Sequence, residues 1–197
     1  MNTKHVSILI FTLLMISGCM SKDIGLLPRD EQFISTKKSK TALIIGSIKE
    51  RYLSESYEAY VVIESLDDKK NENSMLLTTN VTMEAPDSMS KNHTKFYFVF
   101  EVPEGNYQIK KWIFRYRNGK SEKLQPPVVF NFKKGQIYYI GHFLTDPINM
   151  SLSLRDNSQK DIHAIKNKYF NFPKQKVINL SKKYLFNNWK LVIKTIH

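Results

Sequence analysis

The stretch KFYFVFEVPEGNY, residues 95–107, indicates the fold class of the chain. Phe96, Phe98 and Phe100 occupy every second position, and this period of two is typical of a β-strand with one buried face. The Pro-Glu-Gly at residues 103–105 suits a tight turn, after which apolar residues resume. We therefore expect a strand, a reversal and a second strand.

The same period continues from residue 41 to residue 155 and predicts seven strands. Their expected bounds are residues 41–48, 57–64, 96–101, 107–117, 128–133, 136–143 and 150–155. The sets expected to face the core include Tyr57, Ala59, Val61 and Ile63 in one strand and Met150, Leu152 and Leu154 in another. Asn118-Gly119 and Lys134-Gly135 suit further hairpin turns. Short strands and short turns predict a mainly β fold, an antiparallel β-sandwich of about seven or eight strands, with a partly open barrel as the alternative.

One C-terminal helix is expected from Ser158 to about residue 170. Ser158 can cap it, Asp161 follows three residues later at a position that favours an acid, and Pro173 ends it. Residues 177–180 suit a strand, 181–186 a turn of helix and 189–193 a final strand. We expect residues 41–197 to form one domain.

The N-terminal residues 1–18 have the layout of a secretory signal peptide. Lys4 precedes an apolar run, residues 6–16, that holds only two polar residues. This run is little more than half of the roughly 20 residues that a membrane-spanning helix needs. It predicts a cleavable signal and an exported protein.

The tetrapeptide Ile16-Ser17-Gly18-Cys19 resembles the lipobox of bacterial lipoproteins. The resemblance implies cleavage between Gly18 and Cys19, followed by lipidation of the Cys19 thiol and acylation of its amine. Two or three long acyl chains would hold the protein on a membrane. Met20 in place of aspartate implies outer-membrane sorting in a double-membrane bacterium; in a single-membrane bacterium the protein would lie outside the plasma membrane. The alternative is an ordinary signal peptide with a chance cysteine.

Residues 19–40 are expected to form a flexible tether between the lipid and the domain. They contain the basic run at 37–40, and no sustained apolar period. Cys19 is the only cysteine, so no disulfide forms within one chain.

The segments 98–107 and 129–141 also resemble carboxypeptidase regulatory-like and transthyretin-like sandwich domains of uncharacterised envelope lipoproteins. The shared feature is a Pro-x-Gly-x-Tyr turn, with Gly135 later preceding a Tyr-Tyr-Ile-Gly strand. The resemblance implies a sandwich fold and no catalytic residues.

The chain carries a formal charge of +12, which falls to +11 when residues 1–18 are removed, since Lys4 is the one charged residue in that segment. Such a field favours anionic partners, which in a cell envelope are polymers or lipid head groups rather than nucleic acid. Alternation from residue 110 to 117 places Trp112, Phe114 and Tyr116 on one face. The other face then carries a possible anionic-ligand stripe, Lys111, Arg115 and Arg117, or simply a solvated surface.

No catalytic motif is present, and no cofactor or metal site is predicted. His142 and Asp146 are about 13 Å apart on an extended strand, too far apart to share a metal. Asp156, Asp161 and His163 could form an acid-base group at the start of the helix.

The leading hypothesis is a non-enzymatic binding or structural module, anchored to a membrane through Cys19 and with an envelope protein as a possible partner. The alternative is a basic accessory protein that binds anionic polymers or head groups. The third hypothesis is a hydrolase with a site near His142, Asp146 and His163.

Overall fold

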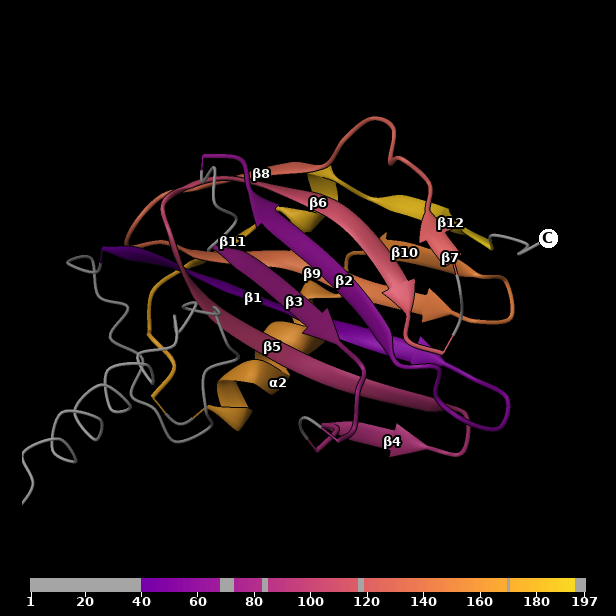
Figure 1. Ribbon diagram of the computed structural model, residues 1–197. Helices are drawn as coiled ribbons and strands as arrows, with labels where there is room; N and C mark the ends of the chain where they lie inside the picture. The colour runs from indigo at the N-terminus through magenta and orange to yellow at the C-terminus, as the bar shows by residue number, and fades with distance from the viewer. Residues whose placement is uncertain (1–39, 68–72, 83–84, 117–118, 170, 194–197) are drawn as a thin grey trace, which may run out of the picture.

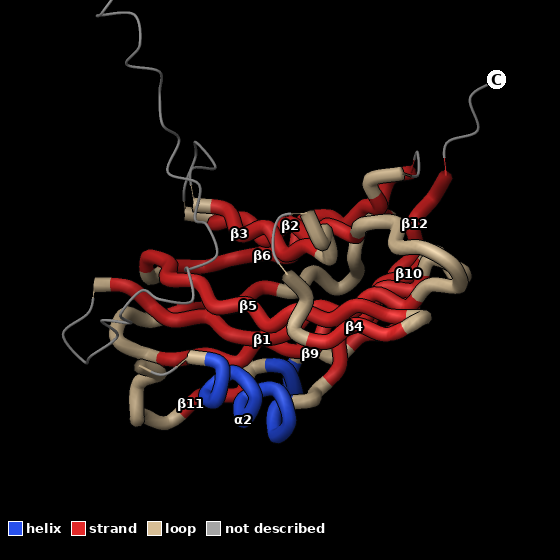
Figure 2. Tube along the Cα trace, turned by 90° about the horizontal axis from the view of Figure 1, so that it is seen from below, coloured by secondary structure: helices blue, strands red, loops and turns tan. Residues whose placement is uncertain are grey.

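A computed structural model describes residues 40–67, 73–82, 85–116, 119–169 and 171–193. The signal, Gly18, Cys19 and most of the expected tether lie outside these ranges. Figure 2 shows three layers, in which a small sheet and a large sheet pack face to face and a helix covers the outer face of the large sheet. The predicted β-sandwich with one helix is confirmed.

The elements follow one another along the chain as in Figure 1. The strands are β1 (Thr41–Arg51), β2 (Ala59–Ser65), β3 (Ser74–Thr78), β4 (Ser88–Ser90), β5 (His93–Pro103), β6 (Gly105–Phe114), β7 (Gly119–Ser121), β8 (Val129–Phe132), β9 (Ile137–Asp146), β10 (Ser151–Arg155), β11 (Val177–Asn179) and β12 (Phe186–Ile193). The helix is α2 (Ser158–Lys168), and a 3-10 turn, η2 (Ser181–Lys183), precedes β12. The expected strands are all present, and β3, β4 and β7 are additional short ones.

The large sheet has the order β4-β5-β1-β9-β10-β12-β7, with β11 also paired to β9. The small sheet has the order β3-β2-β6-β8. Most neighbours are antiparallel, as expected, but β1 and β11 each run parallel to β9. Parallel neighbours need a crossover connection, and the chain between β1 and β9 makes it through strands of both sheets, β2 to β8.

The main core lies between the two sheets. Phe96, Phe98 and Phe100 of β5 are buried there, as the alternation predicted, in one cluster with Val61 and Ile63 of β2 from the other sheet. A fully buried side chain of this size contributes about 1.5–3 kcal/mol. The sheets are therefore held together by the apolar faces that the period of two identifies.

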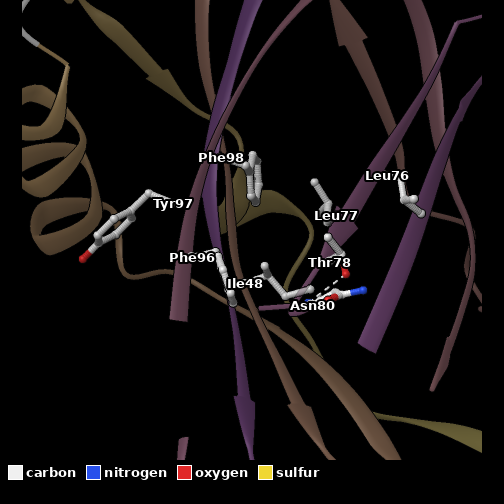
Figure 3. Close-up of a pocket in the computed structure, with 8 residues that line it drawn as sticks. All are labelled: Ile48, Leu76, Leu77, Thr78, Asn80, Phe96, Tyr97 and Phe98. Carbon is white, nitrogen blue, oxygen red and sulfur yellow. Dashed lines mark hydrogen bonds between the residues drawn. The ribbon is translucent and has the colours of Figure 1, made fainter. Parts of the chain in front are cut away.

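A second apolar cluster lies between the large sheet and α2. It comprises Leu43, Ile45, Val99, Ile137, Tyr139, Ile165 and Tyr169. Figure 3 shows the two faces of β5, with Tyr97 pointing to the helix side and Phe96 and Phe98 to the opposite side. The central strands are thus apolar on both faces because both faces are covered.

The three predicted turns connect strands of different sheets, so the prediction of hairpins was wrong. Pro103 ends β5 in the large sheet and Gly105 starts β6 in the small sheet. Gly135, with φ of 70°, lies between β8 and β9, which also belong to different sheets. Gly119 starts β7, which pairs with β12 and not with β6; Asn118 lies outside the described residues. A turn sequence reverses the chain, but it does not choose the strand that accepts the hydrogen bonds.

Two irregularities in pairing change which side chains share a face. In β6 the register with β2 shifts so that Lys111 pairs with Val62 and Ile109 with Ile63, and both Lys110 and Lys111 are exposed. In β9 the register with β1 passes from Tyr139 directly to Gly141. Such bulges insert one residue and reverse the alternation beyond it.

The bulge in β9 requires glycine. Gly141 has φ of +131°, and a Cβ placed there would lie 2.4 Å from Cδ1 of Leu154 and 3.4 Å from the carbonyl oxygen of Arg155. The facing residue of β1, Gly46, has no room for a Cβ either, since its position would be 2.6 Å from the carbonyl oxygen of Gly141. The two glycines let β1 and β9 stay paired through the bulge.

We expect Gly141→Ala to lower the free energy of unfolding by about 2 kcal/mol or more, through backbone strain and overpacking against Leu154. Urea denaturation followed by circular dichroism measures the change. Leu185→Ala, at a position that is 55% exposed, is the control and should change stability by less than about 0.5 kcal/mol. Equal stability of Gly141→Ala and the native chain would contradict this account of the bulge.

Candidate functional site

The structure resolves the predicted basic stripe into residues with different partners. Lys111 is exposed, whereas Arg115 donates to Glu58 at 2.9 Å and forms an ion pair with it. Arg117 lies outside the described residues. Tyr116 is 61% exposed and does not join Trp112 and Phe114 in the core, because β6 ends at Phe114.

A groove of about 700 Å³ runs beside the exposed lysines of β6 and is called the side groove below. Its lining includes Lys110, Lys111, Ser121, Glu122 and Lys123. Lys110 is 3.3 Å from Glu64, an exposed contact that contributes little to stability. The bulge in β6 thus presents two adjacent lysines on the surface of the small sheet.

The predicted acid-base groups do not form. Asp146 accepts hydrogen bonds from the backbone N–H groups of Ile148 and Asn149 in the turn after β9. His163 contacts Asn167 on the exposed face of α2. Asp156 accepts from the backbone N–H of the residue at the start of the helix, Ser158. Each of these carboxylates is engaged locally, as expected for turn and helix-start positions.

His142 and Asp161, which the sequence placed in separate groups, meet instead in a buried polar cluster between the large sheet and α2. Asp161 is fully buried and accepts hydrogen bonds from Ser47 at 2.6 Å, Tyr139 at 2.8 Å and Lys95 at 2.7 Å. Ser47 Oγ is 2.7 Å from Nδ1 of His142. Since the single hydroxyl hydrogen of Ser47 goes to Asp161, Nδ1 of His142 is the donor in that contact.

The bulge in β9 makes this cluster possible. Tyr139 and His142 are three residues apart and would face opposite sides of a regular strand, yet both contact the group around Asp161. The prediction that Asp161 acts at the helix N-terminus is incomplete, because its side chain points into the sheet. The prediction that Ser158 caps the helix was wrong, because Ser158 is the first helical residue and Asn157 is at the cap position. The side-chain amide of Asn157 donates to Asp161 at 2.8 Å.

Serine, histidine and aspartate together suggest nucleophilic catalysis, but the geometry does not match. In a catalytic triad the imidazole lies between the other two groups, whereas here Ser47 bridges His142 and Asp161, which are 4.0 Å apart. Ser47 is fully buried and lines none of the grooves described here. The arrangement docks α2 onto the sheet by satisfying every polar atom of Asp161.

Burial shifts two pKa values in the cluster. Burial lowers the pKa of His142 to about 4; the carboxylate of Asp161 opposes this, and the positive charges of Lys95, Lys49 and Arg155 add to it. Burial also raises the pKa of Tyr139, with Asp161 adding to the effect. His142 is therefore neutral at pH 7.

A second polar cluster closes the inside of the sandwich at the end where β1 finishes. Glu50, on the inner face of β1 and fully buried, accepts from Ser56 at 2.7 Å, from the backbone N–H of Tyr57 at 2.6 Å and from Thr79. Thr79 in turn accepts from the backbone N–H of Ala59 at 2.8 Å. The carboxylate thus ties the loop after β1 to the end of β3.

A groove of about 670 Å³ opens beside this cluster, and we call it the end groove. Its lining includes Tyr52, Glu55, Glu58, Met89, Thr94 and Tyr116. Thr94 is 1% exposed, and its hydroxyl has no hydrogen-bond partner in the described part of the chain. By contrast, the gap between the sheets drawn in Figure 3 measures about 10 Å³, which is no larger than one water molecule.

Within the described ranges, no three histidine, cysteine or acidic side chains gather in a way that would hold a metal ion. No helix in the same ranges is long and apolar enough to cross a membrane. Comparisons of the chain with protein-family models, with curated proteins and with solved structures find no match.

We expect the buried, neutral His142 to make the protein less stable in acid. The unfolded chain takes up a proton near the ordinary pKa of 6.5, whereas the folded chain does so only near 4. The contribution of the neutral His142 to the free energy of unfolding is therefore fully present above pH 6.5. It is lost as the pH drops to 4, by about 3 kcal/mol at most. Urea denaturation at several pH values between 7.5 and 4 measures this slope.

His142→Asn should be less stable at pH 7.5 but should show a shallower loss toward pH 4. His163→Asn, on the exposed helix face, should keep the native slope. An unchanged slope in His142→Asn would show that other groups cause the acid sensitivity.

Proposed function

We propose that this protein is a lipid-anchored module of a bacterial cell envelope that binds a partner and catalyses no reaction. The observation that carries the anchoring is the sequence Ile16-Ser17-Gly18-Cys19 at the end of the apolar run, with the only cysteine of the chain in the acceptor position. We place the lipidated protein at the outer membrane of a double-membrane bacterium, or on the outer face of a single membrane.

The geometry of the folded part supports the binding role. The serine, histidine and aspartate that could do nucleophilic chemistry are buried beneath α2 and occupied with one another. The two largest open grooves described here are lined instead by lysines in one case and by apolar side chains with carboxylates in the other. Concave surfaces of this kind favour binding.

We expect Cys19→Ser to move the protein from the membrane fraction to the soluble fraction of its native host and to abolish labelling by a radioactive fatty acid. The reason is that acyl chains hold the protein at about 0.8 kcal/mol per buried methylene. Mass spectrometry of the native N-terminal peptide should find Cys19 as the first residue, with its thiol and amine acylated. An unmodified thiol would end the proposal.

A second candidate function is binding of anionic envelope polymers or lipid head groups at the side groove. It is favoured by the exposure of Lys110 and Lys111 on the β6 bulge and by Lys123 across the same groove. Arg115 is already paired with Glu58, so the stripe that the sequence suggested is reduced and shifted toward Lys123.

In a Cys19→Ser background, we expect Lys111→Glu combined with Lys123→Glu to weaken sedimentation with anionic vesicles by about tenfold or more, since each surface lysine contributes roughly 1 kcal/mol. Lys174→Glu combined with Lys176→Glu makes the same change in net charge at other exposed positions and is the matched control. Equal losses in both double variants would mean that net charge alone, and not the side groove, attracts the vesicles.

A further inference from the structure

Exposed apolar side chains gather at the end of the sandwich that holds the end groove. Of the nine large apolar residues that are exposed in the described ranges, five line this groove or the smaller one of about 300 Å³ beside it. They are Leu53, Val81, Met89, Tyr116 and Ile148. Ser54 and Tyr57 line both grooves, so the apolar surface is continuous, as at protein interaction sites.

The charged side chains that line the end groove are carboxylates, Glu55 and Glu58, in a chain whose net charge is +12. Phosphates and other anions are therefore disfavoured here, in contrast to the side groove. Glu58 already has Arg115 as a partner, while Glu55 lies on the loop after β1. This charge distribution favours an apolar segment that carries positive charge.

The wall of the groove also offers hydrogen-bonding groups for a polypeptide. The hydroxyl of Thr94 has no partner among the described residues, although burial of such a group costs free energy. Met89 lies on β4, which is an edge strand of the large sheet. An extended peptide can add to such an edge and place a side chain in the adjacent groove.

The position of the end groove relative to the expected anchor points to a protein rather than the anchoring bilayer. Figure 1 shows β1 beginning at the opposite end of the sheet from the loop after β1 and β4. The 11 residues of β1 span about 36 Å. The end groove thus lies at the far end of β1 from Thr41, where the expected tether joins the domain, and this position favours a protein over the anchoring bilayer as the partner.

We propose that the end groove binds an extended segment of a partner envelope protein, one with apolar side chains between lysine or arginine residues. The apolar side chains cover Val81, Met89 and Tyr116, a basic residue faces Glu55, and a polar group of the segment pairs with the hydroxyl of Thr94. The peptide segment specifies the class of partner for the binding role proposed above, and the preference for a protein over the bilayer rests on the lipidation proposed there.

The test measures fluorescence anisotropy of labelled synthetic peptides that carry Val-Leu-Val between two lysines, between two glutamates, or with serines in place of the apolar residues. We expect the full mature chain to bind the lysine-flanked apolar peptide at least about tenfold more tightly than either of the others. Met89→Ser combined with Tyr116→Ser should weaken this binding about tenfold, and Leu185→Ser, at another exposed apolar position, should leave it unchanged.

Thr94→Val should weaken peptide binding about fivefold, because a hydrogen bond is lost, while the melting temperature stays the same or rises, because an unpaired hydroxyl is removed. Equal binding of the three peptides, or full binding by the Met89→Ser and Tyr116→Ser variant, would overturn the proposal. Two other results would also overturn the proposal, if the native chain binds none of the peptides. One is self-association of the native chain that the double variant abolishes, and the other is vesicle binding by the native chain that the double variant abolishes.

The same titration in Cys19→Ser separates the two proposals. If Cys19→Ser binds the peptide and mass spectrometry finds an unmodified thiol on native Cys19, the proposed anchoring is overturned and the proposed peptide site stands. If native Cys19 carries lipid and the protein binds none of the peptides, the proposed peptide site is overturned and the proposed anchoring stands.

Discussion

Strand β1 is covered on both of its faces, and this constraint organises the rest of the molecule. It lies between β5 and β9 and uses its backbone hydrogen bonds on both edges, while its inner face packs against the small sheet and its outer face against α2. Every polar side chain that β1 buries must therefore find a partner within the protein. Ser47 on the outer face and Glu50 on the inner face are those side chains. Ser47 bridges two members of one hydrogen-bonded cluster, and Glu50 is the centre of the other.

The two clusters do different work because they lie on different faces. The group around Asp161 fixes a helix that would otherwise rest on a small apolar area, and the pairing of Lys95 with Asp161 keeps a buried charge compensated. The group around Glu50 orders the loop after β1 and so shapes one wall of the end groove. Buried polar residues that look like catalytic groups in the sequence thus have a structural explanation.

The surface divides into regions of opposite character. The side groove is lined by lysines on the β6 bulge, and the end groove combines apolar side chains with carboxylates. Because charge complementarity selects partners, the two grooves favour different ligands. The two proposals therefore assign a polyanion to the side groove and a basic apolar segment to the end groove.

The sequence by itself determined most of the strands, the buried face of each regular strand, the helix and the sandwich class, since alternation and helix-ending residues are local properties. Phe96, Phe98 and Phe100 are buried as their spacing predicts. Only the tertiary structure decided which sheet receives each strand after a turn, and where a bulge reverses the alternation. Those choices depend on hydrogen bonds and packing between residues distant in sequence, such as Gly46 with Gly141. For that reason His142 and Asp161 could be noticed in the sequence but not brought together. Ser47, a polar residue in the apolar row of Leu43 and Ile45, is a local signal of the buried cluster that the sequence prediction did not use.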